Sequence, residues 1–594
     1  MKELTICGAD ISEFSLVLPE NPAPALKTAA VFLQRVVDAS CGVTLPIAER
    51  AEHGIFVGTR SASDDVKWDG YRITAQNGSL YLDGNIPRGT LYAAYSFAER
   101  YLGYRYFADD CEVVPTEGKT AIPCDVDIID NPVFEVRRTT CASHLASGEF
   151  SAHCRLNDCM PVGEEHGGTV GITGGCHTFD ALCPPSVYFK EHPEYYSYRD
   201  GRHYPTSGDP NGEHGQLCLT NPDVVRIVTE NVLKWLREHP GQRVVEVSHA
   251  DNRCYCMCEK CRAVYEEEGA PSGTLIRFLN AVAEEVEKEF PDVLIRTFAY
   301  QYTRKPPKLT KAHPSILVRY CTIEACFRHA LDDPHCETNA KTFGPELLAW
   351  QKMASNISIW DYVTNWRCYN APFPNLHSLR ENARFFADCH VIHVLSECNA
   401  GSGGGVYPVL KAYLLGKLLW NPYMSEEEYD THINEFLRAY YGKGWESIRR
   451  YIDMEHELTA ECEMGCWAEA DMACCFSCET PRIWDHIASH YNPEAYQPVY
   501  PGETYLDGLK ERIGEVNALF DRAEELAETE AQKRHLLISR MSIRYVELFC
   551  MPHEKGSMTE EARAAYEGAV EEFLKNKEEY DIRYNVWTSN YLQR

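Results

Sequence analysis

The chain has 594 residues, a length that suits about two to four domains rather than one core. Its 44% apolar and 25% charged content is typical of an ordinary globular protein. The formal net charge of -30 argues against nucleic acid and anionic membranes as partners, and no apolar run approaches the roughly 18 residues that span a bilayer.

The amino-terminal segment MKELTICGADISEF reaches acidic residues at once and lacks the apolar stretch of a secretory signal. The chain also holds 26 cysteines, many adjacent or one residue apart. Thiols in this number, without a visible export signal, favour a reducing cytoplasm over a disulfide-stapled secreted fold. We therefore expect a cytoplasmic protein, although an exported chain whose signal had been removed would look the same.

Residues 1–125 are expected to form a small α+β domain. An apolar stripe at helical spacing covers residues 26–37 and ends at Gly42. Further on, Asn77-Gly78 separates two strand-like runs, which is a strong signal for a β-hairpin.

Residues 126–423 alternate between short apolar runs and stretches of helical period, a pattern typical of a parallel sheet. A segment of about 300 residues suits a (β/α)8 TIM barrel with long loops. Residues 142–215 are poorly periodic and are expected to be active-site loop, whereas residues 424–594 are amphipathic and are expected to form a helical domain. The expected fold class is therefore α/β, a central barrel between an α+β and a helical domain. The expected barrel strands are FEVRRTT, VVEVS, VLIRTFAY, ILVRYCTIE, ISIWDY and VIHVLSE.

Three carboxylates stand at the ends of three successive expected strands: Glu324, Asp361 and Glu397. In a barrel these strand ends share one mouth, where catalysis takes place. Glycosidic cleavage needs one protonated and one ionised carboxyl group. Glu324 follows the apolar run ILVRYCTI, and an apolar setting keeps a carboxyl group protonated, so we expect it to be the acid and the other two to be candidates for the second role. The alternative for each carboxylate is an ion pair with a neighbouring arginine.

Aromatic and polar residues near the same strand ends strengthen the prediction of a sugar site, because sugar rings pack a C–H face on flat side chains. Strand alternation points Trp360 and Tyr362 one way and Asp361 the other, which favours core packing for Trp360. For the pair Asp251 and Asn252 an Asx cap that turns the chain into the next loop is at least as strong an alternative as sugar binding, and His177 has the same ambiguity. The candidate substrate-binding residues are His177, Asp251, Asn252, Tyr300, Tyr362, Asn365 and Trp366.

The segment SHADNRCYCMCEKC can supply three thiolates, from Cys256, Cys258 and Cys261, to a structural zinc whose fourth ligand comes from elsewhere. The alternatives are free thiols or one local disulfide. A thiol or zinc enzyme centred here would place these sulfurs in the substrate cleft. No Walker loop, dinucleotide fingerprint or H-E-x-x-H motif is present, so we expect no required cofactor.

Six segments carry a family resemblance, in this order: HTFDALCPPSVYFKEHPEYYS, QLCLTNPDV, SHADNRCYCMCEKC, IEACFRHALDD, WDYVTNW and PFPNL. They resemble the bacterial domain-of-unknown-function 4838 family, some of whose members founded glycoside hydrolase family 163, endo-β-N-acetylglucosaminidases that act on N-glycans. The resemblance covers about residues 130–420, and the amino-terminal module looks like the domain before the barrel in α-glucuronidases and β-hexosaminidases. It places the family's glutamate at Glu324 and its aspartate at Asp361.

The resemblance implies a glycoside hydrolase that cleaves β-N-acetylglucosaminide linkages in N-glycan-derived or related oligosaccharides, with endo or exo action left open. We expect retention, with the acetamido group of the substrate as nucleophile. Two alternatives remain: a glycosidase for a uronide or another hexosaminide, and a catalytically silent carbohydrate-binding protein on the same barrel. The expected partner is an oligosaccharide, and a homo-oligomer is left open.

Overall fold

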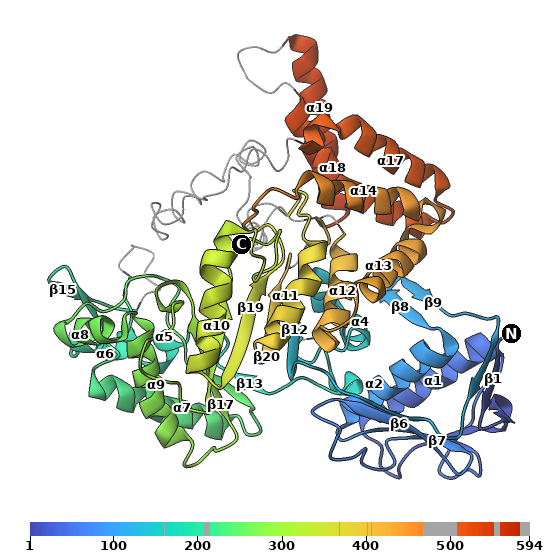
Figure 1. The fold of residues 1–594 in the computed structure, drawn as a ribbon, viewed down its shortest axis with the longest axis horizontal. Helices are drawn as coiled ribbons and strands as arrows, with labels where there is room; N and C mark the ends of the chain where they lie inside the picture. The colour runs from blue at the N-terminus through green and yellow to red at the C-terminus, as the bar shows by residue number, and fades with distance from the viewer. Residues whose placement is uncertain are drawn as a thin grey trace.

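The computed structural model shows an amino-terminal mixed module, a central parallel sheet with its helices, and a group of helices at the carboxyl-terminal end (Figure 1). The structure describes residues 1–159, 161–206, 214–366, 369–400, 402–405, 407–466, 508–551 and 559–582.

The amino-terminal module is a six-stranded mixed sheet packed against helices α1 (Pro24–Cys41) and α2 (Pro87–Phe97), and it confirms the expected α+β architecture. A smaller sheet joins β1 (Glu3–Ile6), β2 (Ala9–Asp10) and β10 (Lys119–Ile122), and β8 (Arg105–Ala108) pairs with β9 (Cys111–Val113). The six strands, in sheet order, are β11 (Asp127–Asp130), β6 (Tyr71–Gln76), β7 (Ser79–Gly84), β5 (Gly54–Val57), β3 (Ser15–Val17) and β4 (Ile47–Ala48).

The local signals in this module act as expected. Helix α1 ends at Gly42, whose φ of 71° is the left-handed conformation that glycine adopts at low cost. Gln76 pairs with Ser79 across a two-residue turn in which Asn77 and Gly78 have φ of 52° and 74°. Two positive φ values match the right-handed twist of the flanking strands, so the predicted hairpin is confirmed.

The central sheet has seven parallel strands, and the six strands expected from the sequence are all confirmed. The seventh, β13, lies in the stretch that was expected to be loop only. A closed eight-stranded barrel is not confirmed. In the described residues β12 and β13 are the two edge strands of the sheet, and they do not pair with each other. The strands, in sheet order, are β12 (Val136–Thr139), β20 (Val391–Glu397), β19 (Asn356–Tyr362), β18 (Ile316–Cys321), β17 (Leu294–Ala299), β16 (Val244–Glu246) and β13 (Ile172–Thr173).

Helices lie along the connections between these strands. Helix α7 begins after Asn221, whose side chain accepts a hydrogen bond from the Asp223 N–H at 2.9 Å, and Pro222 occupies its first position. The main helices are α7 (Pro222–Glu238), α8 (Glu259–Glu268), α9 (Ser272–Val286), α10 (Gly344–Met353), α11 (Leu376–Asp388) and α12 (Pro408–Trp420), and shorter ones are α3 (Ala142–Ala146), α4 (Gly148–His153), α5 (Phe179–Leu182) and α6 (Pro185–Tyr188).

The two faces of the sheet differ in polarity. One face, called the inner face here, carries Glu246 and Arg296, whose side chains form a buried ion pair at 2.6 Å, and Arg319, which lies over the Trp360 ring. The other face packs apolar side chains such as Ile359 against the helices. Side chains alternate between the faces along each strand, so position in the strand decides which residues can meet a substrate.

Every element described beyond residue 424 is helical, as the sequence predicts. Helix α13 begins with a capping box at Ser425, and α14 packs against α17 (Figure 1). None of the described helices has the length and apolar character to cross a membrane. The domain limits 1–125, 126–423 and 424–594 stay predictions. The helices are α13 (Glu426–Tyr441), α14 (Trp445–Leu458), α17 (Ile513–Leu526), α18 (Glu530–Cys550) and α19 (Glu560–Glu579).

Candidate active site

The carboxyl ends of β16 to β20 bring several of the expected site residues together. Glu397 ends β20 and Tyr362 ends β19, while Tyr300 follows β17 directly and Asp251 lies in the loop after β16. These four residues and Trp360 define the mouth, the name used below for this edge of the sheet. The rings of Trp360 and Tyr362 stack with an interplanar angle of 13° and form one wall.

Glu397 is a protonated carboxyl group near neutral pH. Burial raises its pKa to about 8, although a hydrogen bond from the Trp360 indole N–H to Oε2, at 2.6 Å, opposes the shift. Its side chain is not fully buried, so a ligand can reach it. Glu397 is therefore the glutamate of the mouth whose pKa is raised by burial, although the charges of Arg138 and Arg319 oppose the rise.

Asp251 supplies a second carboxylate at the mouth. Its Oδ1 accepts hydrogen bonds from the Tyr300 hydroxyl and from Nε2 of Gln301, both at 3.1 Å. Burial raises the pKa of the Tyr362 hydroxyl, and the negative charges of Glu397 and Asp251 raise it further.

Glu324 also lies at this edge of the sheet, but its surroundings correct the expected apolar setting. Its carboxylate forms ion pairs with Arg253 at 3.1 Å and with Arg304 at 2.7 Å. Burial raises the pKa of the Cys466 thiol, and the charges of Glu324 and Glu397 raise it further. The carboxylate of Glu324 is therefore held between two guanidinium groups and does not lie in an apolar pocket.

Asp361 does not join the other two acids, which corrects the expectation of one pocket. It lies between Trp360 and Tyr362 in β19, and those two rings face the mouth, so its side chain points to the helix face. There its Oδ1 accepts a hydrogen bond from the Thr322 hydroxyl at 3.4 Å, and burial raises its pKa to about 7.

The remaining substrate-binding candidates divide into two groups. His177 is half-buried near the mouth: its ring lies 5.2 Å from Phe298, and Nδ1 is 2.7 Å from the His249 carbonyl oxygen. Trp366 packs edge-on to Tyr362 at 6.0 Å. In contrast, the Asn252 side chain accepts a hydrogen bond from the Cys254 N–H at 2.9 Å, which is the Asx turn of the alternative interpretation.

Asn365 is buried three residues after the end of β19.

The sequence analysis missed Arg253, Arg304 and Gln301, which hold the acidic residues of the mouth in place. Their signal in the sequence is weak, because each follows a strand and only the fold brings it to a carboxylate.

The sulfur atoms of Cys256, Cys258 and Cys261 lie close together, and the sulfur atom of Cys218 lies in the same group.

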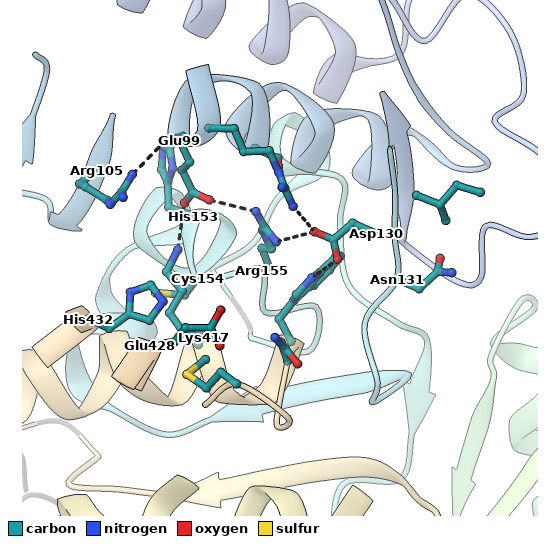
Figure 2. A pocket seen from close by; sticks show the side chains of 17 residues that line it. Glu99, Arg105, Asp130, Asn131, His153, Cys154, Arg155, Lys417, Glu428 and His432 are labelled. Carbon is teal, nitrogen blue, oxygen red and sulfur yellow. Dashed lines mark hydrogen bonds and ion pairs between the residues drawn. The ribbon is translucent and has the colours of Figure 1, made fainter. Parts of the chain in front are cut away.

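A large cavity lies away from the mouth, between the amino-terminal module and helices α12 and α13 (Figure 2). It has a volume of about 780 Å³. Its charged walls are already paired, since Glu99 bonds Lys417 at 2.9 Å and Arg155 at 3.1 Å, and Arg155 also contacts Asp130. We therefore interpret this cavity as part of the interface between the amino-terminal module and helices α12 and α13.

The family model described as domain of unknown function DUF4838 matches residues 106–453, more than half of the chain. The chain belongs to this family. Membership in glycoside hydrolase family 163 is not confirmed, and a comparison with curated proteins finds no match.

Solved structures with a similar fold include glycoside hydrolases. A family GH115 4-O-methyl-α-glucuronidase with specificity for decorated arabinogalactans is 11% identical with a TM-score of 0.54, over 94% of this chain and 75% of that one. The chitobiase of Flavobacterium johnsoniae is 11% identical with a TM-score of 0.44, over 92% and 90%. At 11% identity, the likeness to the α-glucuronidase shows a shared fold alone. The TM-score of the chitobiase is too low to add a conclusion about this chain.

Proposed function

We propose that the chain is a glycoside hydrolase whose active site is the mouth. The observation that carries this proposal is that Glu397, whose pKa is raised to about 8, accepts a hydrogen bond from Trp360 of the stacked aromatic wall, while Asp251, hydrogen-bonded by Tyr300, lies at the same edge of the sheet. Cleavage of a glycosidic bond needs such a protonated group and an ionised one, and sugars bind against flat rings. The substrate is therefore a carbohydrate.

In the proposed reaction, Glu397 donates its proton to the glycosidic oxygen as the bond from this oxygen to the anomeric carbon breaks. The acetamido oxygen of the substrate attacks the same carbon, and Asp251 accepts a hydrogen bond from the acetamido N–H. Water then opens the cyclic intermediate and gives its proton to Glu397, which returns to the acid form. Two displacements at one carbon retain the anomeric configuration.

We assign Glu324 a positioning role in this site. Its carboxylate holds Arg253, which is close to Asp251 in the chain, and Arg304. This assignment moves the acid from Glu324 to Glu397 and the amide-polarising carboxylate from Asp361 to Asp251. Both changes follow from the contacts of these side chains rather than from the sequence motifs.

The proposed substrate is a β-N-acetylglucosaminide linkage in N-glycan-derived or related oligosaccharides. Support comes from the six motif segments and from membership in the family. The alternatives are a uronide or another hexosaminide linkage. Endo and exo action both remain compatible with the site.

The test is a screen of purified protein against released N-glycans, N-acetylglucosamine disaccharides, uronides and aryl glycosides, with the first-formed anomer read by NMR. We expect a retained product, and a thiazoline analogue of the cyclic intermediate should bind far more tightly than N-acetylglucosamine. An inverted product would overturn substrate assistance, and cleavage of uronides alone would overturn the proposed linkage. Saturable sugar binding without cleavage would identify a carbohydrate-binding protein instead.

A further inference from the structure

Four cysteines from two separate segments converge beside helix α8. Cys256, Cys258 and Cys261 lie at the start of this helix, and Cys218 joins them from the segment after β15 (Arg202–Tyr204). All four sulfur atoms lie within 4.8 Å of one another. The sulfur of Cys218 is 3.8 Å from that of Cys258 and 3.9 Å from that of Cys261.

These separations fit sulfur atoms around one tetrahedral ion. Zinc–sulfur bonds of about 2.3 Å in a tetrahedron place neighbouring sulfurs about 3.8 Å apart. A disulfide would bring two sulfurs to about 2.05 Å, and all four cysteines are free thiols. We propose that Cys218, Cys256, Cys258 and Cys261 bind one structural zinc ion.

The surroundings of the sulfurs supply the partners that thiolates need. The Tyr198 N–H donates to the Cys256 sulfur at 3.3 Å, and the Thr220 hydroxyl lies 3.2 Å from the sulfur of Cys261. Such outer contacts fix ligand orientation and stabilise negative charge on sulfur. Cys258 also occupies the N-cap of α8, where the helix dipole favours an anion.

Four protein ligands leave the ion no open position for a substrate, so its role is structural. Cys256 and Cys261 are buried in a small cluster of their own with Tyr265. This arrangement argues against a zinc or thiol enzyme centred on these residues. It favours an ion that links the segment of Cys218 to the segment of Cys256, Cys258 and Cys261. This link is called the clamp below.

The clamp holds the loop that carries Asp251. Gln216, close to Cys218 in the chain, donates from Nε2 to the Ala250 carbonyl at 2.8 Å and to the Asn252 carbonyl at 3.0 Å. It also accepts the Ala250 N–H at 3.0 Å. Asp251 lies between these two anchored residues, so loss of the ion should loosen the proposed catalytic loop; this consequence rests on the proposed function.

Metal analysis of the purified full chain tests the site without any activity assay. We expect the Cys218→Ser variant to lose about one zinc ion per chain relative to the wild type. Cys254→Ser is the matched control, because Cys254 lies in the same cysteine-rich run but outside the four-sulfur group, and it should keep the ion. Cys326→Ser, in the separate group of Cys326, His329 and Cys336, is a second control and should also keep the ion held by the four cysteines.

Cobalt provides a second readout that does not depend on how well a variant folds. Wild-type protein exchanged into Co²⁺ should show the visible absorption of tetrahedral thiolate cobalt, and X-ray absorption of the zinc form should show only sulfur ligands near 2.3 Å. Equal zinc content in the wild type and Cys218→Ser would overturn the site. Iron in place of zinc, or ligands other than sulfur, would overturn the assignment of the ion. Unchanged zinc binding in a chain without glycosidase activity would instead contradict only the proposed function.

Discussion

At the scale of single residues, a raised pKa does not by itself identify a catalytic acid. Burial raises the pKa of Glu397 to about 8, that of Glu455 to about 8 and that of Asp361 to about 7. Glu455 receives a hydrogen bond from Tyr451 inside α14, and Asp361 faces the helices. Only Glu397 among these three lies beside the aromatic wall of the mouth, so position rather than proton affinity decides the assignment.

Glu397→Gln should lower kcat about 10²–10⁴-fold on substrates with poor leaving groups, because protonation of the leaving oxygen is lost. The loss should shrink on activated aryl glycosides, whose leaving groups need little protonation. Glu455→Gln is the matched control, since it changes another buried glutamate with a raised pKa away from the mouth, and it should keep its activity. Steady-state kinetics on both substrate types would contradict the role of Glu397 if the two losses were equal.

If Glu397 is the acid of the proposed reaction, the Trp360–Glu397 hydrogen bond should help to set the alkaline limit of activity. The indole N–H stabilises the ionised carboxylate and so lowers the pKa of Glu397 against the effect of burial. In Trp360→Phe the pKa should rise, the acid should stay protonated to higher pH, and the alkaline limb of kcat/KM should move upward from about pH 8. Trp445→Phe, on the helical part of the chain, should leave the limb in place. A downward shift in Trp360→Phe would exclude Glu397 as the group that titrates.

At the scale of elements, strand alternation sorts the acidic residues between two faces. The sequence analysis noted that Asp361 points away from Trp360 and Tyr362, yet it kept Asp361 in the site because Asp361 stands at a strand end, as Glu324 and Glu397 do, and it assigned Trp360 to the core. The strand ends at Tyr362, as the expected run ISIWDY does, so the alternation extends through Asp361 and its side chain faces the helices.

Asp361→Asn should therefore leave kcat within a few-fold of the wild type while it changes the pH dependence of stability. Burial raises the pKa of Asp361 from 3.8 to about 7, so folding binds a proton between these values and wild-type stability falls as the pH rises through this window. The variant lacks this term. Its free energy of unfolding, relative to the wild type, should rise by about 1.4 kcal/mol per pH unit between pH 3.8 and about pH 7 and stay constant above it.

Urea unfolding at several pH values measures this difference. Taking variant minus wild type removes the contributions of Glu397 and Glu455, which titrate in both proteins. A difference that does not change with pH would show that Asp361 is not buried on the helix face. A loss of kcat as large as that expected for Glu397→Gln would return Asp361 to the site.

Long β-branched runs made the fold predictable, and short or distant features did not. The strands around Ile316–Cys321 and Val391–Glu397 are continuous apolar runs, so the sequence located them. Strand β13 has two residues in a glycine-rich stretch and carries no periodic signal. The setting of Glu324 was not predictable because Arg253 is separated from it by 71 residues and meets it only through the fold.

The same limit applies to the proposed zinc site. Three of its cysteines lie within one short segment, and their spacing was recognised, but Cys218 lies 43 residues before Cys261. With 26 cysteines in the chain, spacing alone cannot select the fourth ligand. Only the packing of the two loops identifies it.

At the scale of the whole molecule, buried charges join the amino-terminal module to the central sheet. Asp69 belongs to the module, and Arg137 belongs to β12, the edge strand of the central sheet. Arg137 Nη2 lies 2.6 Å from Asp69 Oδ2, and the two side chains are 0% and 1% exposed. Arg88 contacts the same carboxylate at 3.2 Å. One carboxylate therefore compensates two guanidinium groups at the junction.

Asp69→Asn should cost about 3–5 kcal/mol of unfolding free energy, because it leaves buried arginine charge without a partner. Asp127→Asn is the matched control: Asp127 also pairs with an arginine, Arg72 at 2.7 Å, but its side chain is 52% exposed, and such surface pairs contribute about 0–1 kcal/mol. Denaturant unfolding followed by tryptophan fluorescence measures both variants. Because Asp69 joins two parts of the chain, its loss should also separate their transitions, with the module unfolding before the sheet. An Asp69→Asn protein that unfolds in one transition, at the wild-type midpoint, would contradict the view that this carboxylate couples the module to the sheet that carries the mouth.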